Sequence, residues 1–95
     1  MKLLKDKTAI VTGGAGGIGA ACARRFAEEG ASFILIADLN LEEGQARADE
    51  ITKEFGTHCI AVKTNVVNEE EISRVFTEFK KHRENLDILL NCAGI

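Results

Sequence analysis

Thr12-Gly13-Gly14-Ala15-Gly16-Gly17-Ile18-Gly19 is the stretch that decides the fold of this chain. It follows the apolar run 9–11 and opens a segment in which apolar residues recur at helical spacing from Ile18 onward. This order of signals predicts a strand, a tight turn and a helix. The first N–H groups of such a helix are unpaired and lie at the positive end of its dipole, so they favour an anion. Glycine has no side chain, so a pyrophosphate can come close to the backbone of the turn.

Two glycine spacings fit this loop. The general dinucleotide fingerprint G-x-G-x-x-G falls on Gly14, Gly16 and Gly19. The spacing T-G-x-x-x-G-x-G falls on Thr12, Gly13, Gly17 and Gly19. The P-loop pattern G-x-x-x-x-G-K-[S/T] is absent from the sequence, which argues against a nucleotide triphosphatase of that class. The alternative interpretation is a glycine-rich turn that serves only the close packing of strand and helix.

Strand and helix signals alternate along the whole chain. The expected strands cover residues 8–12, 33–37, 58–62 and 87–90. The expected helices cover residues 17–29 and 41–55, and a third helix is expected after Asn68. Asn40 with Glu43 and Asn68 with Glu71 have the spacing of a capping box at the start of the second and third helices. Their inner faces are expected at Ile18, Cys22 and Phe26; at Gly44, Ala48, Ile51 and Phe55; and at Ile72, Val75, Phe76 and Phe79. The order β-α-β-α-β-α-β predicts a single α/β domain over residues 1–95, a doubly wound parallel sheet with strand order 3-2-1-4 and a nucleotide crevice between the first and fourth strands.

Composition limits the kinds of partner. A chain of 95 residues with 45% hydrophobic and 28% charged residues fits one small globular domain. The net charge of −3 argues against nucleic acid, and the longest apolar runs are far too short to cross a membrane. Three cysteines without C-x-x-C spacing indicate reduced thiols and a cytoplasmic location. His58 and Cys59 have no further metal ligands at useful spacing, so we expect core or edge packing and no metal site.

Asp38 ends the second expected strand, 19 residues after Gly19. An acid at this place accepts hydrogen bonds from the ribose hydroxyls of a dinucleotide. Its charge would repel the additional phosphate of NADP, and no arginine directly follows it, so we expect NAD to be preferred over NADP. The alternative is a turn aspartate that precedes the cap Asn40.

The later motifs make a resemblance specific. Asn65-Val66 follows the third strand, and Leu86-Asp87-Ile88-Leu89-Leu90-Asn91-Cys92-Ala93-Gly94 covers the fourth. With the T-G-x-x-x-G-x-G loop, the chain resembles the N-terminal part of a short-chain dehydrogenase/reductase over essentially all 95 residues. The resemblance implies a Rossmann-like fold, a sheet tied together by Asn91, and a cofactor lined by Ala93 and Gly94. The expected cofactor-binding residues are Gly13, Gly16, Gly17, Ile18, Gly19, Asp38, Leu39, Asn65, Val66, Asn91, Ala93 and Gly94.

The sequence departs from the family pattern in three respects. Asn65 stands where the family has an aspartate that accepts from the adenine amino group, and Cys92 replaces the second asparagine of N-N-A-G. The family's catalytic serine, tyrosine and lysine lie beyond this region, and the chain contains no tyrosine, so no catalytic residue is assigned. The incomplete sheet would leave an open edge, for which we expect self-association or a homo-oligomer.

Two functions follow from these expectations. The first is the NAD-binding portion of an NAD-dependent oxidoreductase that exchanges hydride with a secondary alcohol or ketone in the complete enzyme, while the 95-residue chain alone is inactive. The alternative is a stand-alone module that binds NAD or an adenine nucleotide without catalysis.

Overall fold

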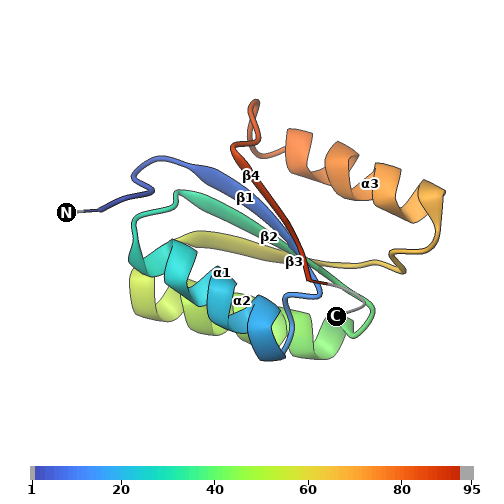
Figure 1. Cartoon of the computed structure of the whole chain (residues 1–95), viewed down its shortest axis with the longest axis horizontal. Coiled ribbons are helices and arrows are strands. Elements are labelled where there is room, and N and C mark those ends of the chain that lie inside the picture. The colour runs from blue at the N-terminus through green and yellow to red at the C-terminus, as the bar shows by residue number, and fades with distance from the viewer. Residues whose placement is uncertain (1, 93–95) are drawn as a thin grey trace.

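Four parallel strands and three helices alternate along the chain in this computed structural model, which describes residues 2–92. The strands are β1 (Thr8–Thr12), β2 (Phe33–Asp38), β3 (His58–Lys63) and β4 (Ile88–Asn91). The helices are α1 (Gly17–Glu28), α2 (Leu41–Phe55) and α3 (Glu69–Lys80). The strands lie in the order β3-β2-β1-β4, which confirms the predicted topology (Figure 1). None of the helices within residues 2–92 is long and apolar enough to cross a membrane.

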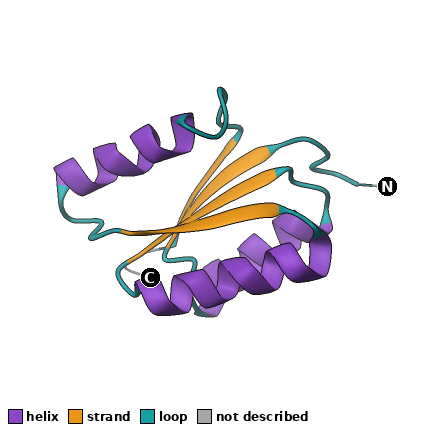
Figure 2. Ribbon diagram, turned by 180° about the vertical axis from the view of Figure 1, so that it is seen from behind, coloured by secondary structure: helices purple, strands orange, loops and turns teal. Residues whose placement is uncertain are grey.

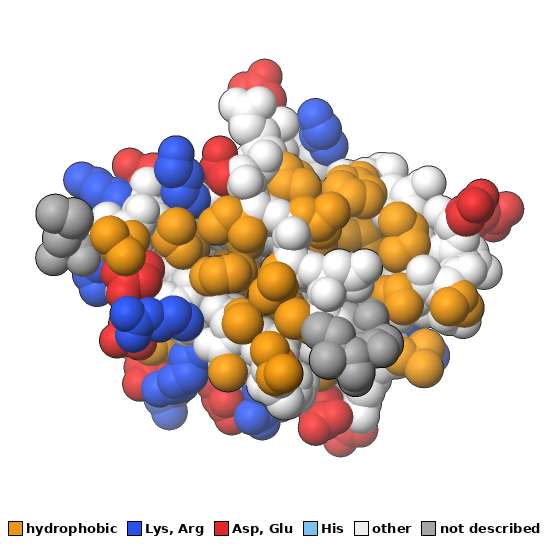
Figure 3. Space-filling view, viewed as in Figure 1, with side chains coloured by type: hydrophobic (Ala, Val, Ile, Leu, Met, Phe, Trp, Pro, Cys, Tyr) orange, Lys and Arg blue, Asp and Glu red, His pale blue; other side chains and the backbone are white. Residues whose placement is uncertain are grey.

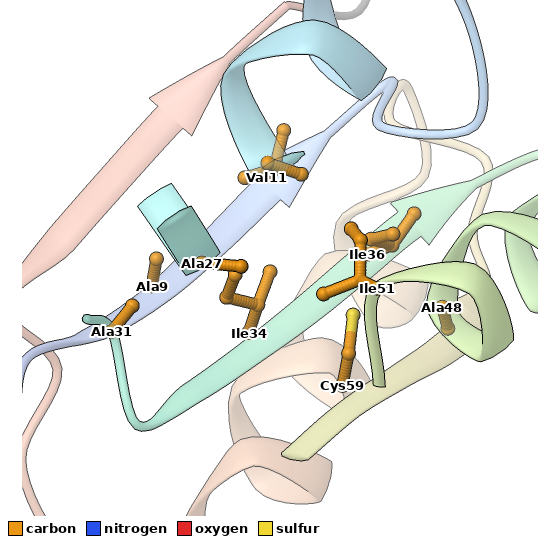
Figure 4. Close-up of a cluster of buried hydrophobic side chains, with 10 residues drawn as sticks. Ala9, Val11, Ala27, Ala31, Ile34, Ile36, Ala48, Ile51 and Cys59 are labelled. Carbon is orange, nitrogen blue, oxygen red and sulfur yellow. The ribbon is translucent and has the colours of Figure 1, made fainter. Parts of the chain in front are cut away.

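The sheet lies between two helical layers. Helices α1 and α2 cover one face and α3 covers the other, as the view from behind also shows (Figure 2). The side chains of Phe33 to Ala37 in β2 are fully buried, as predicted for a central strand covered on both faces. The cluster beneath α1 and α2 contains Ala9, Val11, Ala23, Ala27, Ala31, Ile34, Ile36, Ala48, Ile51 and Cys59 (Figure 4). The cluster beneath α3 contains Ile10, Phe33, Leu35, Ala37, Val75 and Phe79.

The predicted inner face of α1 was wrong. Ile18 is 62% exposed, and the buried residues of the helix are Gly19, Ala23 and Ala27, one position further along the chain. Small residues on this face let the helix approach the sheet closely, because a Cβ atom on Gly19 would overlap the carbonyl group of Gly13. Close backbone packing therefore decides which face turns inward, and the larger side chains of Cys22 and Phe26 lie at its border.

The predicted cap of α2 is present, but its capping box is only half formed. The side-chain oxygen of Asn40 accepts from the backbone N–H of Glu43 at 3.0 Å. The backbone N–H of Asn40 donates to the carboxylate of Asp38 at 2.9 Å instead of to Glu43. Asn68 caps α3 with its side chain in the same manner as Asn40 caps α2.

Several element boundaries and one further helix face differ slightly from the predictions: α1 ends at Glu28, β2 at Asp38 and β4 at Asn91. Strand β4 starts at Ile88 rather than Asp87, because the Asp87 carboxylate accepts from the backbone N–H of Thr8 at 2.9 Å. Strand β3 extends to Lys63, which pairs in register with Asp38. On α3, Phe76 is 38% exposed although it was expected in the core, because it borders a groove beside the edge strand β4.

Candidate functional site

The loops that follow β1, β2 and β3 surround a pocket at the carboxyl edge of the sheet. This pocket has a volume of about 220 Å³ and is lined by Gly13, Ala37, Asp38, Leu39, Thr64, Asn65 and Val66. The structure thus brings together five residues that the sequence analysis placed at a cofactor: Gly13, Asp38, Leu39, Asn65 and Val66. Parallel strands direct their carboxyl ends to one edge, which is where doubly wound folds bind ligands.

Sequence reasoning missed Thr64 in this pocket. Its side chain is almost completely buried, and its hydroxyl donates to the carbonyl oxygen of Val62 at 3.0 Å. Its backbone N–H donates to the carbonyl oxygen of Asp38 at 2.9 Å and so joins the loops after β2 and β3. A single threonine after an apolar run carries no sequence signal for such a link.

The backbone of the glycine-rich loop distinguishes the two possible glycine spacings. Gly13 has φ +71° and Gly17 has φ +56°, conformations that favour glycine, whereas Gly16 has an extended backbone with φ −152°. Gly19 must lack a side chain because it packs against Gly13. Gly13, Gly17 and Gly19 are the glycines of the T-G-x-x-x-G-x-G spacing, so this spacing describes the conformation of the loop.

The amino end of α1 differs from those of the other two helices. Its cap Gly16 makes no side-chain hydrogen bond, and its first turn contains no acidic residue. Helices α2 and α3 begin with asparagine caps and carry two and three acids in their first turns. Apart from its chain neighbours and its own helix, no atom of residues 2–92 lies within 4 Å of the position of a Cβ on Gly17, so among these residues the backbone there faces open space. Uncapped N–H groups, a positive dipole end and free space are what a pyrophosphate group requires.

The carboxylate of Asp38 joins three segments of the site. One oxygen accepts from the backbone N–H of Ala15 at 3.1 Å, and the other accepts from that of Asn40 at 2.9 Å. Asp38 therefore has the turn role that was considered for it, and each oxygen keeps further acceptor capacity toward the pocket. Lys63 pairs in register with Asp38, which places a cation on the neighbouring strand that the sequence analysis did not consider.

Asn65 is held by its own loop. Its side-chain oxygen accepts from the backbone N–H of Val67 at 3.2 Å. Its backbone N–H donates to the carboxylate of Glu71 at 2.9 Å. The amide oxygen expected to face an adenine amino group is therefore already engaged in one hydrogen bond and retains one acceptor site.

Asn91 lies on the other side of β1 from the pocket. The hydroxyl of Thr12 donates to its side-chain oxygen at 2.7 Å and so links β1 to β4. Both residues line an apolar groove of about 120 Å³, together with Ile10, Ile72, Val75, Phe76 and Leu89. Ala93 and Gly94, which were expected beside the cofactor, lie outside the described residues.

The buried cysteine is unsuited to nucleophilic chemistry. Burial, with a smaller contribution from the charge of Asp49, raises the pKa of the Cys59 thiol to about 12, and the side chain lies in the core cluster. His58 lies on the edge strand β3, in agreement with the expected packing at an edge of the fold. Its ring packs edge-on against the ring of Phe33, with 4.9 Å between ring centroids. Within residues 2–92, no three His, Cys, Asp or Glu side chains are grouped so that they could hold a metal ion.

Comparisons with known proteins agree with this architecture. The 3-hydroxyacyl-CoA dehydrogenase type-2 of Drosophila melanogaster is 39% identical over 92 residues, which are 97% of this chain and 34% of that protein. The 3-oxoacyl-[acyl-carrier-protein] reductase FabG of Aquifex aeolicus is 37% identical over 92 residues, 97% of this chain and 37% of that protein. The crystal structure of L-sorbose reductase from Gluconobacter frateurii, complexed with NADPH and L-sorbose, matches with a TM-score of 0.93 and 30% identity over 100% of this chain and 36% of that one.

The chain spans about a third of the length of each of these three relatives. All three are named as dehydrogenases or reductases. The family model of the short chain dehydrogenases matches residues 7–95, which is nearly the whole sequence. The glycine-rich loop, the strand order and this match together show that the chain belongs to the short chain dehydrogenase family.

Proposed function

We propose that residues 1–95 form the amino-terminal, cofactor-binding portion of an NAD-dependent short-chain alcohol or carbonyl oxidoreductase. The observation that carries this proposal is the pocket at the carboxyl edge of the sheet, with Asp38 in its wall and the uncapped start of α1 nearby. When bound, the nicotinamide would supply a hydride donor or acceptor for a ketone or a secondary alcohol. The rest of the complete enzyme would supply the groups that exchange a proton with the substrate. The 95-residue chain alone would therefore bind the cofactor but would not convert a substrate.

The residues of this chain would divide the work of holding the dinucleotide. The N–H groups after Gly17 would receive the pyrophosphate, because they lie at an uncapped helix end beside open space. The carboxylate of Asp38 would accept from the ribose hydroxyls. Leu39, which is 63% exposed, and Val66 would supply apolar surface for the adenine ring, and Asn65 would receive its amino group.

The proposed preference for NAD over NADP rests on the charge of Asp38. Two like charges about 4 Å apart repel by about 4 kcal/mol at an effective dielectric of about 20, and solvent at the pocket mouth reduces this to about 1–3 kcal/mol. Lys63 on the paired strand would offset part of this repulsion. The L-sorbose reductase structure contains NADPH, so this fold also accommodates the additional phosphate. We therefore expect a preference for NAD of about tenfold.

Calorimetric titration of the 95-residue chain with NAD and with NADP tests this proposal. We expect saturable binding of NAD and weaker binding of NADP. Circular dichroism on the same sample establishes that the chain is folded. A folded chain that binds neither dinucleotide would overturn the proposed function.

A module that binds adenine nucleotides without catalysis is the second candidate. It is favoured by the composition of the pocket, which is built entirely from residues between Gly13 and Val66. Titration with ADP-ribose separates the two functions. NAD binding tighter than ADP-ribose indicates a contribution from the nicotinamide side, as an oxidoreductase portion requires. Equal affinities favour the adenine module, and NADH formation from an alcohol by the isolated chain would contradict both proposals.

We propose that the chain associates with itself through the edge strand β4. Within residues 2–92, β4 is paired on one side only, because it lies last in the sheet order. Leu89 on this strand is 55% exposed, and hydrophobic side chains gather on the face that carries β4 (Figure 3). Unpaired strand edges with apolar neighbours favour association. A monomer by light scattering at high micromolar concentration would contradict this proposal.

We also propose a cytoplasmic location. Cys22, Cys59 and Cys92 are free thiols, which suits a reducing compartment. Microscopy of the natural gene product fused to a fluorescent protein tests this location, and secretion of the fusion would contradict it.

A further inference from the structure

The loop between β3 and α3 forms one wall of the pocket, and four of its hydrogen bonds fix its shape. Thr64 is fixed to β2 through its N–H bond to the carbonyl of Asp38. The N–H of Asn68 donates to the carbonyl oxygen of Asn65 at 3.0 Å, and the N–H of Val67 donates to the Asn65 side chain. These bonds close the turn on itself. The fourth bond, from the N–H of Asn65 to the carboxylate of Glu71 at 2.9 Å, fixes the turn to α3.

Glu71 occupies a position where a different partner was expected. It is the third residue of α3, and in a capping box its carboxylate would accept from the backbone N–H of the cap Asn68. That N–H is already bonded to the carbonyl of Asn65. The carboxylate of Glu71 therefore extends past the cap to the backbone of a residue that lines the pocket.

The other two acids of the same helical turn provide a comparison. Glu69 and Glu70 are exposed, and their side chains accept no hydrogen bond from any residue in the described range 2–92. All three acids lie at the positive end of the α3 dipole, so their long-range electrostatic effect on the helix is similar. Only Glu71 adds a contact to the loop.

We propose that Glu71 is a positioning residue for the adenine subsite, in that its carboxylate fixes the shape of the loop at Asn65 and Val66. The inference rests on the proposed function, because it assumes that adenine binds in this pocket. A charged acceptor makes a stronger hydrogen bond to a backbone N–H than a neutral one does. Without it, the N–H of Asn65 would lose its partner, and the loop would adopt several conformations of which few receive the ring.

Three variants test the role of Glu71: Glu71→Ala, Glu71→Gln and, as the matched control, Glu70→Ala. Calorimetry would measure the affinities of the 95-residue chain for AMP, which needs the adenine loop, and for inorganic pyrophosphate, which needs only the start of α1. We expect Glu71→Ala to weaken AMP binding about tenfold and to leave pyrophosphate binding unchanged. Glu71→Gln retains an acceptor and should recover most of the affinity for AMP, and Glu70→Ala should bind both ligands as the wild type does.

A second readout requires no ligand. The backbone amide proton of Asn65 should have a different chemical shift in NMR spectra of Glu71→Ala than in those of the wild type, and Glu70→Ala should leave it unchanged. Unchanged AMP affinity in Glu71→Ala, or an equal loss for AMP and pyrophosphate, would overturn the inference while leaving the proposed function intact. A wild-type chain that binds neither NAD nor AMP would instead overturn the proposed function and the inference with it.

Discussion

The carboxylate of Asp38 accepts a hydrogen bond from the backbone N–H of Ala15 at 3.1 Å, and this bond ties the end of β2 to the glycine-rich loop. The second carboxylate oxygen accepts from Asn40 at the start of α2. One side chain therefore fixes the shape of the loop and sets the charge of the proposed ribose subsite. A substitution that removes the charge and keeps the size of the side chain tests both roles, because cofactor preference and stability are measured separately.

Asp38→Asn should shift cofactor preference toward NADP. The substitution removes the negative charge, so the ratio of NADP affinity to NAD affinity should rise about tenfold. The side-chain NH2 of asparagine replaces one carboxylate oxygen and cannot accept from a backbone N–H, so the free energy of unfolding should fall by about 1 kcal/mol. Calorimetry and chemical denaturation measure the two effects. Glu42→Gln removes a charge from the first turn of α2 outside the pocket and should leave the ratio unchanged. An unaltered ratio in Asp38→Asn would show that the charge does not select the cofactor.

Gly19→Ala should disrupt the packing of α1 on the sheet. A Cβ at this position would overlap backbone atoms of Gly13, which cannot move aside as a flexible side chain would. We expect the free energy of unfolding to fall by about 3 kcal/mol or more, measured by chemical denaturation. Gly16→Ala is the matched control, because its Cβ would lie 4.0 Å from the nearest atom, the carboxylate of Glu43, in an extended backbone. Comparable losses in both variants would contradict this account of the loop.

The topology of this protein could be predicted because its signals are local. Alternating strand and helix patterns predicted every element, and a fully apolar run predicted the buried strand β2. The caps Asn40 and Asn68 were predicted because the capping residue and the N–H groups it binds are neighbours in sequence. Five of the pocket residues, Gly13, Asp38, Leu39, Asn65 and Val66, were predicted because the ends of parallel strands meet at one edge of a sheet.

The remaining features depend on distances that hydrophobic patterns do not encode. The inner face of α1 is formed by glycine and alanine, which carry little hydrophobic signal beside Ile18 and Phe26. The position of Lys63 beside Asp38 depends on the register between β2 and β3, two strands that are separated in sequence by the whole of α2. The carboxylate of Glu71 accepts from Asn65 and not from the cap Asn68, and the sequence pattern carries no signal for this choice of partner.

The stability of the chain should fall as the pH drops through the range in which histidine titrates. Burial, followed by the charges of His82 and Arg83, lowers the pKa of His58 below its usual value of 6.5. The ring packs against Phe33 and His82, and the carboxylate of Glu78 lies 3.7 Å from His82. Because the unfolded chain takes up a proton at His58 before the folded chain does, the stability is complete above pH 6.5 and is lost progressively below it.

Denaturation by guanidinium at about pH 7.5 and about pH 5.5 measures this effect. We expect a lower midpoint at the acidic pH for the wild type and a smaller difference between the two conditions for His58→Gln. The variant keeps a polar side chain at the start of β3 but cannot take up a proton in this range. If His58→Gln lost as much stability as the wild type, the pH dependence would come from other groups.

Leu89→Lys should weaken self-association through the edge strand. Leu89 lies on β4 and borders the apolar groove beside α3, so a contact that covers this edge would bury its side chain. A charged side chain on an edge strand opposes pairing with another chain, and the lost apolar burial corresponds to a dimer about tenfold weaker or more. Light scattering over a concentration series measures the shift toward monomer. Leu41→Lys is the matched control, because Leu41 is 43% exposed but lies at the start of α2, away from β4. If Leu41→Lys dissociated the assembly and Leu89→Lys did not, the contact would lie on the α2 side of the molecule and the edge of β4 would remain open.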